Sequence, residues 1–160
     1  MLRFPNPVDE RAARTVALGV LLLATLTVAT HQHLLLVPLA YGFAARVASG
    51  PRLSPLGLVA TRVVVPQLPG RPRPVAGPPK RFAQAVGLAF SATALVLALG
   101  LHQERAADVL LLGLIAAAAL ESFAGICLGC KVFALGMRLG LVPAQVCEAC
   151  ADISLRRRAA

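Results

Sequence analysis

The feature that most constrains the fold is the uncharged stretch from Thr15 to Ala45. One straight helix of that length would extend about 46 Å at 1.5 Å per residue, whereas the hydrocarbon core of a bilayer is about 30 Å thick. The polar cluster His31-Gln32-His33 lies at the middle of the stretch. We therefore expect a tight hairpin of two membrane-spanning helices, at about residues 11–30 and 33–49.

Composition indicates that the rest of the chain is also built for a membrane. Of its 160 residues, 58% are hydrophobic and 14% are charged, against about 45–50% and about 25% in typical soluble domains. Two further apolar runs predict helices at about 82–101 and 106–126, joined by a turn at residues 102–105. The prediction is an all-α membrane protein with four transmembrane helices as two hairpins. Both hairpin tips contain His-Gln, a pattern that duplication of a two-helix unit would leave.

The distribution of basic residues predicts the orientation in the membrane. The chain has 16 Lys and Arg against 7 Asp and Glu, a net charge of +9. The hairpin tips hold a single arginine, and most of the other basic residues lie in the N-terminal segment, the 50–81 loop and the tail. Because cytoplasmic loops are enriched in Lys and Arg, we expect both termini and the central loop in the cytoplasm. No stacking aromatic residues are interleaved with the arginines, which argues against a nucleic-acid partner.

The basic, proline-rich loop at 50–81 is the one long connection. Its first part, 53–68, is apolar around Arg62 and is expected to form a short helix in the membrane interface. Its second part, 69–79, is rich in proline and is expected to be a strap without helix or strand. A wholly disordered loop is the alternative.

Four cysteines form two matched pairs, Cys127-Leu128-Gly129-Cys130 and Cys147-Glu148-Ala149-Cys150, and there are no others. We expect a four-helix membrane domain over residues 1–130 and a cytoplasmic segment over 131–160 that joins an amphipathic stretch to the second pair. Paired cysteines of this spacing indicate metal binding, thiol–disulfide exchange or sulfur transfer. On the reducing face of a bilayer, permanent structural disulfides are not expected.

A zinc site is one interpretation of the four cysteines. Each of the two Cys-x2-Cys pairs would supply half of a tetrahedral shell, with Cys127, Cys130, Cys147 and Cys150 as ligands. Zinc–sulfur bonds of about 2.3 Å require the tail to fold back beneath the fourth helix. Residues 131–142 are long enough to make that return as a short amphipathic helix.

Redox chemistry is the other interpretation of the same residues. One thiolate of a pair attacks a partner disulfide, and the second cysteine resolves the mixed intermediate. Cys127 and Cys130 would be the membrane-proximal catalytic pair, with Cys147 and Cys150 as the resolving or relay pair. Packing of the cysteines as small apolar residues without a function is the remaining alternative.

The reactivity of the first pair depends on where the fourth helix ends. If the helix runs unbroken through Cys130, its negative C-terminal end disfavours a thiolate there. If Gly129 breaks it and a new helix begins at Lys131, Cys130 lies at a positive helix N-terminus beside a cation. The sequence permits both arrangements.

The segment Glu121–Lys131, with the first cysteine pair inside it, resembles the C-terminal signature of a bacterial membrane family known as domain of unknown function 4395. Residues Pro7–Arg14 and Lys80–Ala83 also resemble that family's patterns. The resemblance implies a small four-helix protein of the bacterial inner membrane without an established activity. Because members of the family often accompany thioredoxin-like or sulfurtransferase proteins, it also implies partners of those two kinds.

Glu121 is an acidic residue well inside an apolar run. An unpaired ionisable group there costs several kcal/mol, so we expect Glu121 to form an intramembrane ion pair with Arg46 or with an N-terminal arginine, and proton handling is the alternative. The three histidines, His31, His33 and His102, map to the outer tips. They could converge on a metal, but polar turn residues are the more frequent explanation.

Together these patterns predict thiol–disulfide exchange or sulfur transfer at the cytoplasmic face, with a thioredoxin-like or sulfurtransferase partner. One alternative is a non-enzymatic membrane protein whose four cysteines hold a structural zinc ion. Another is an accessory subunit that binds a partner protein within the membrane.

Overall fold

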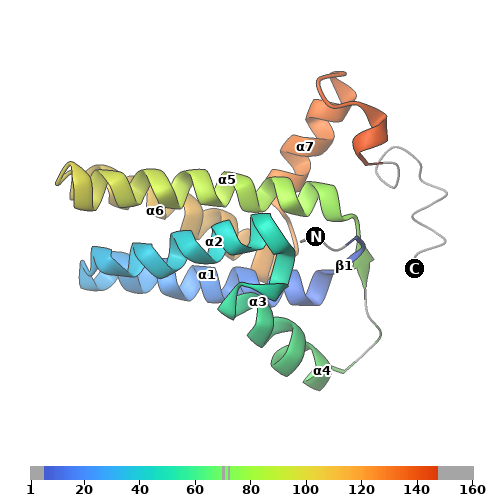
Figure 1. Ribbon diagram of the computed structural model, residues 1–160, viewed down its shortest axis with the longest axis horizontal. Helices are drawn as coiled ribbons and strands as arrows, with labels where there is room; N and C mark the ends of the chain where they lie inside the picture. Colours follow the sequence, from blue (N-terminus) through green and yellow to red (C-terminus); the bar gives the residue numbers. More distant parts are fainter. Residues whose placement is uncertain (1–5, 70, 72, 148–160) are drawn as a thin grey trace.

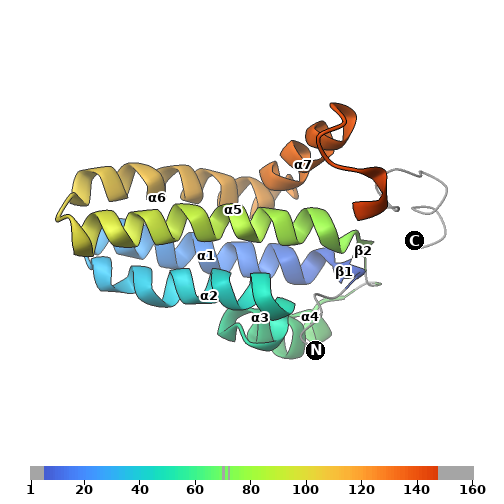
Figure 2. The same cartoon turned by 45° about the horizontal axis from the view of Figure 1, so that its top comes forward.

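The computed structural model describes residues 6–69, 71 and 73–147. Its long helices lie side by side along the length of the molecule (Figures 1 and 2). Four helical ranges are long and apolar enough to cross a membrane, as in a multi-pass membrane protein: Glu10–Thr30, His33–Gln67, Gly77–Gly100 and Glu104–Ala124.

The helices are α1 (Glu10–Thr30), α2 (Leu36–Ser49), α3 (Pro55–Val59), α4 (Val65–Gln67), α5 (Gly77–Leu95), α6 (Glu104–Ala119) and α7 (Leu128–Arg138). Three π-helical turns follow α3, α5 and α6 without a break, at Ala60–Val64, Val96–Gly100 and Leu120–Ala124. Short 3₁₀ turns lie at His33–Leu35, Gly50–Arg52 and Ala144–Val146. Strands β1 (Val8–Asp9) and β2 (Pro74–Val75) pair antiparallel.

Both tips of the long helices turn in the same way. Helix α1 ends at Thr30, and its C-cap residue His31 has a left-handed backbone with φ of 53°. At the second tip, between α5 and α6, His102 has φ of 55°. Few non-glycine residues adopt this conformation, so its occurrence at the two His-Gln sequences makes the tips structurally alike.

The proline-rich strap is more ordered than predicted. Val75 pairs with Val8 in the two-stranded ladder, and the Gly77 amide donates to Asn6 Oδ1 at 3.0 Å. Helix α5 then begins at Gly77 with two prolines in its first turn, a position where proline's missing N–H costs nothing. The expectation of a strap without helix or strand was therefore wrong, and the third long helix starts five residues before the predicted residue 82.

The first part of the loop is helical from Pro55 to Gln67. Ser54 caps its start, because its hydroxyl accepts a hydrogen bond from the Gly57 amide at 3.3 Å. This segment diverges from the long helices (Figure 1) but contacts α1 through its π-helical turn. A helix in this part of the loop is confirmed.

The core of the bundle consists mainly of alanine and leucine. Helix α1 packs mainly against α6, and α2 packs mainly against α5. Alanines at these contacts allow close approach of the helices, which is how membrane helices gain packing energy. The outer faces carry exposed apolar side chains such as Leu22, Val109 and Leu112. This distribution suits a bilayer around the long helices.

Candidate functional site

The first cysteine pair lies where the fourth long helix ends and α7 begins. The helix stops at Ala124, and Gly125 follows with φ of 68°, the left-handed conformation that glycine adopts without strain. Helix α7 starts at Leu128 with Cys127 as its N-cap residue. The break therefore falls at Gly125, and neither of the two arrangements expected from the sequence is correct. Cys127 lies at the positive end of α7.

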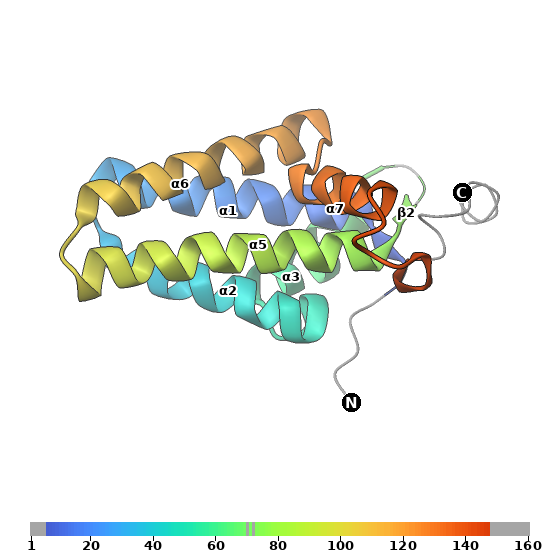
Figure 3. The same cartoon turned by 90° about the horizontal axis from the view of Figure 1, so that it is seen from above.

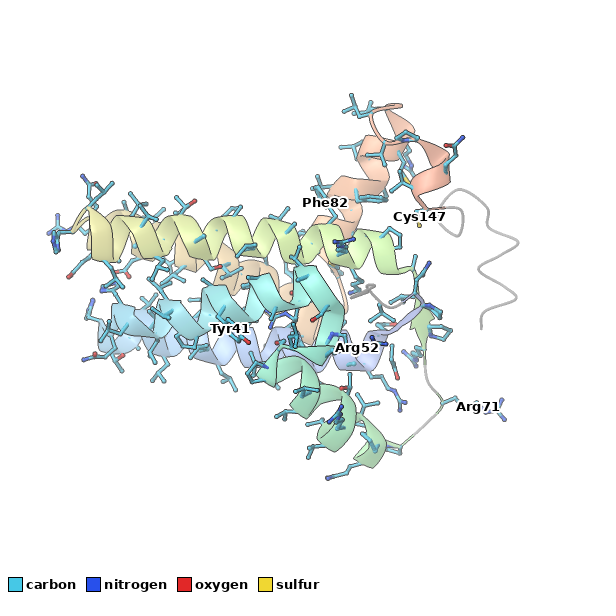
Figure 4. The ribbon with its side chains drawn as sticks, in the orientation of Figure 1. Tyr41, Arg52, Arg71, Phe82 and Cys147 are labelled. Atoms are coloured by element: carbon cyan, nitrogen blue, oxygen red, sulfur yellow. The ribbon has the colours of Figure 1, made fainter. Side chains whose placement is uncertain are left out.

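Helix α7 crosses α5 at very short range (Figure 3). A Cβ atom added at Gly129 would lie 2.6 Å from both Cα and Cβ of Ala83. Next to this contact, the rings of Phe82 and Phe133 pack with their centroids 5.7 Å apart, and Phe82 lies beside α7 in Figure 4. The glycine inside the Cys-x2-Cys motif thus lets α7 approach α5, which positions both thiols.

Cys127 and Cys130 are free thiols. Cys127 is 7% exposed, and Cys130 is half-buried. The Cys130 thiol donates a hydrogen bond to the Cys127 sulfur, and this bond together with the positive charge of Lys80 lowers the pKa of Cys127 against the opposing effects of burial and Glu121. The same hydrogen bond, reinforced by burial, raises the pKa of Cys130. Cys127 is therefore the thiol that ionises first, as its place at a helix N-terminus also favours.

A buried ion pair lies beside the thiols. Lys80 Nζ, in the first turn of α5, is 2.5 Å from Glu121 Oε1, at the end of the fourth long helix. Both side chains are at most 14% exposed. The pair ties α5 to the helix end that precedes Cys127, and its short contact provides the compensation that a buried charge requires.

Arg46 does not form the predicted ion pair with Glu121. Its Nε donates to Gln84 Oε1 at 2.6 Å, and its Nη1 donates to Ser54 Oγ at 3.0 Å. The guanidinium also lies 4.6 Å from the centre of the Phe43 ring. The reason is packing: α2 lies mainly against α5, so Arg46 meets α5 at Gln84.

The N-terminal arginine nearest this region binds backbone instead of Glu121. Arg14 Nε donates to the Ser122 carbonyl at 3.1 Å, and Nη2 donates to the Phe123 carbonyl at 2.9 Å. These carbonyls belong to the last turn of the fourth long helix, where a cation is stabilising. Arg14 thus holds the helix end from which the chain turns toward Cys127.

Two charged residues that form ion pairs, Lys80 and Asp108, were missed in the sequence analysis. Lys80 was assigned to the loop, although the two prolines before it could have indicated a helix start. Asp108 was passed over as part of an apolar span, yet its Oδ1 is 3.2 Å from Nε2 of the buried His33 at the far tip. His33 and Asp108 each lie within a few residues of a predicted hairpin tip. That shared position could have indicated that the two side chains meet.

The second cysteine pair is placed in part. Cys147 is buried, lies beyond the C-terminal end of α7 (Figure 4), and is disulfide-bonded, which was not expected on a reducing face. Cys150 lies outside the described residues. Across residues 6–69, 71 and 73–147, no group of three or more His, Cys, Asp or Glu side chains is arranged to hold a metal ion. The four-cysteine zinc site stays a prediction.

A cavity of about 310 Å³ lies against the first pair. Cys127 and Glu121 line one part of it, together with apolar residues from α1, α2, α5, α6 and α7. The structure therefore brings together a polarised thiol pair, an ion pair and an apolar cavity at one end of the bundle.

The family model described as Domain of unknown function (DUF4395) matches residues 8–138, so the chain belongs to this family. The match covers the long helices, the first cysteine pair and α7. No curated protein and no solved structure matches the chain.

Proposed function

We propose that this member of the DUF4395 family is a membrane dithiol–disulfide oxidoreductase with Cys127 and Cys130 as its redox couple. The observation that carries the proposal is the position of the two free thiols at the start of α7, with Cys127 as its N-cap residue and Cys130 in its first turn, where a hydrogen bond from Cys130 lowers the pKa of Cys127. A sulfur that accepts such a bond at a helix N-terminus, near a lysine, is favoured as a thiolate. The thiolate is the form that attacks disulfides.

The exchange proceeds in two balanced steps. The Cys127 thiolate attacks one sulfur of a partner disulfide, forms a mixed disulfide, and releases the other partner sulfur as a thiolate. Cys130 then loses its proton and attacks the Cys127 sulfur. The Cys127–Cys130 disulfide forms, and the partner leaves with both of its thiols reduced. In the opposite direction the same steps oxidise a partner dithiol.

The concentration of basic residues in the N-terminal segment, the central loop and the tail supports a topology with both termini and the cysteines in the cytoplasm and with the helices paired as two hairpins whose tips face outward. A thioredoxin-like protein is the partner that fits this location, because it presents a reactive disulfide to other thiols. The half-buried Cys130 and the exposed Lys131 mark the side from which such a protein approaches.

Cys147 fits a relay role in this scheme. It is oxidised while Cys127 and Cys130 are reduced, so an electron pair could pass from the first couple to the Cys147 disulfide. In that transfer one dithiol becomes a disulfide as the other disulfide becomes a dithiol, and no external oxidant is needed.

Trapping tests the proposal with two matched variants in lipid nanodiscs. Cys130→Ser keeps the attacking sulfur but cannot resolve the intermediate, so incubation with a thioredoxin that retains only its attacking cysteine, oxidised as a mixed disulfide with a small thiol, should release the small thiol and give a reducible covalent adduct. Cys127→Ser should give none. Absence of an adduct from Cys130→Ser would overturn the thioredoxin-like partner, and equal adducts from both variants would overturn Cys127 as the attacking thiol.

Metal and sulfur analysis of the same wild-type sample tests the alternatives. One zinc ion per chain that leaves the thiols unreactive would assign a structural metal site and overturn the redox proposal. A persulfide on Cys127 that passes to an acceptor, without a Cys127–Cys130 disulfide, would assign sulfur transfer instead.

A further inference from the structure

The cavity beside Cys127 has the shape and surface of a ligand site. Its volume of about 310 Å³ lies at the lower end of the range of about 300–1,000 Å³ that small-molecule sites occupy. Buried residues of α1, such as Val16 and Val20, form one side, and aromatic rings of Phe43, Phe82 and Phe90 form others. Rings of this kind stack with flat aromatic ligands.

The cavity borders on the flank of the bundle that would face lipid. Three of its lining residues on α5, Phe82, Val86 and Phe90, are each 37–38% exposed. Gly113 of α6 also lines it and is exposed. Because α5 and α6 are both long enough to span the membrane, a molecule dissolved in the bilayer can reach the cavity without passing through water.

Polar groups are few in this cavity. Among the described lining residues, only Gln84, Glu121 and Cys127 carry polar or sulfur-containing side chains. Gln84 Oε1 already accepts a hydrogen bond from Arg46, so the remaining polar group of that amide is its NH₂, a donor. Glu121 is held by Lys80. The ligand that fits is apolar over most of its surface, with a hydrogen-bond acceptor.

The burial of Cys127 adds a constraint on what can react with it. At 7% exposure Cys127 is largely covered by the surrounding protein, and the residue lines the cavity. Cys130 does not line the cavity and is more exposed. The two thiols of one redox couple therefore meet different surroundings, one the cavity and the other the water-facing side of α7.

We propose that the cavity binds a membrane quinone, which accepts an electron pair from the Cys127–Cys130 couple. The inference rests on the proposed function, since it names the acceptor of the same dithiol. The quinone ring lies among the phenylalanines, a ring carbonyl accepts from the Gln84 NH₂, and the isoprenoid chain leaves between α5 and α6 into the bilayer. An acyl chain would fill the same space but has no group that can take electrons from the dithiol.

The electrons and protons balance in this reaction. The Cys127 thiolate adds to a ring carbon of the quinone, and Cys130 loses its proton and attacks the Cys127 sulfur. The bond between sulfur and ring breaks, its electron pair stays on the ring, and the disulfide forms. Overall the dithiol loses two electrons and two protons, and the quinone gains both as the quinol.

The experiment uses the full-length, reduced protein in phosphatidylcholine nanodiscs without oxygen. Decylubiquinone is the benzoquinone probe and menadione is the naphthoquinone probe, so the two arms distinguish the ring types. We expect one quinol per dithiol from at least one probe, with a Cys127–Cys130 disulfide as the other product. A redox-inert dimethoxybenzene with the same decyl chain should compete with decylubiquinone.

Two matched substitutions on α6 locate the reaction. Ala117→Leu fills the cavity, whereas Ala116→Leu adds the same side chain at the next residue, which is exposed and does not line it. Ala117→Leu should lower the rate of quinone reduction about tenfold or more, and Ala116→Leu should not change it. Circular dichroism and thermal unfolding of both variants control for folding, and competition by the inert analogue on the wild-type protein needs no variant.

The outcomes separate this inference from the proposed function. If Cys130→Ser traps the thioredoxin but neither quinone is reduced, the quinone site is wrong and the oxidoreductase assignment stands. Equal rates for the two folded leucine variants, or failure of the inert analogue to compete, would also overturn the cavity as the site. If no thioredoxin adduct forms but both quinones are reduced at Cys127, the quinone site stands and the protein partner is wrong.

Discussion

Replacing Gly129 by alanine tests the contact on which the geometry of the thiol pair depends. The new Cβ would lie 2.6 Å from Cα and Cβ of Ala83, whereas carbon atoms normally approach to about 3.5–4.0 Å. Helix α7 would have to move away from α5 by about 1 Å. Gly136→Ala in the same helix is the matched control, since its Cβ would meet only Val142 Cγ2 at an ordinary 3.4 Å.

The size of the effect follows from two opposing terms. Alanine favours a helix over glycine by about 0.5–1 kcal/mol, and both variants gain this term. Only Gly129→Ala adds overpacking against a neighbouring backbone, which costs about 1–3 kcal/mol. Gly129→Ala should therefore be less stable than Gly136→Ala by about 1–3 kcal/mol. Its thiols should also react more slowly, because Cys127 moves away from Lys80.

The assay is equilibrium unfolding in mixed micelles with increasing dodecyl sulfate, followed by circular dichroism. Alkylation of Cys127 by iodoacetamide, read by mass spectrometry, gives the second measurement on the same samples. If the two alanine variants unfold at the same detergent fraction and Cys127 reacts equally in both, α7 does not rest on α5 at Gly129, and our account of how the thiols are positioned is refuted.

Three further predictions concern the groups around the thiols. Cys130→Ala removes the hydrogen bond that lowers the pKa of Cys127, so the pH profile of Cys127 alkylation should move to higher pH, and an unchanged profile would contradict the bond. Lys80→Met leaves Glu121 buried without its partner and should lower the free energy of unfolding by about 3–5 kcal/mol. The double variant with Glu121→Gln should recover most of that stability in the same unfolding assay. Arg14→Met removes two charge-assisted hydrogen bonds to the end of the fourth long helix and should lower the stability by about 1–3 kcal/mol. Amide hydrogen exchange at residues 125–127 should become faster, and exchange equal to wild type would argue that Arg14 does not hold this helix end.

The long helices could be predicted from the sequence because their signal is local. An apolar run of suitable length has few other uses, and the polar tips at residues 31–33 and 102–105 divide the runs into spans of membrane thickness. The caps are also local: Asp9 precedes α1, and its carboxylate accepts a hydrogen bond from the Arg11 amide at 3.0 Å.

The end of the fourth long helix could not be predicted, because contacts far apart in sequence determine it. Gly125 and Gly129 are equally good helix breakers by composition. The structure ends the helix at Gly125 since Arg14 binds the carbonyls of Ser122 and Phe123 there, while Gly129 is needed inside α7 for its contact with Ala83. Neither contact leaves a pattern within one stretch of sequence.

The ion-pair partners depend on helix pairing in the same way. Glu121 was expected to need a cation, and it has one, but the choice between Arg46, an N-terminal arginine and Lys80 is made by which helices pack together. The start of α5 at Gly77 places Lys80 inside the bundle instead of in the loop. With that boundary drawn five residues too late, Lys80 could not be a candidate.

The packing of α1 against α6 and of α2 against α5 has a consequence for how the chain enters the membrane. Arg14 in the first long helix and Arg46 in the second donate hydrogen bonds to residues of the last two, at 122–123 and 84, while Arg46 also donates to Ser54 within the first half. During synthesis the first half is inserted before those acceptors exist. Its two guanidinium groups then lack these partners at the edge of a lipid phase, where an unpaired charge is costly. We therefore expect the N-terminal half to be less stable by itself than in the complete chain, where the second half supplies these acceptors.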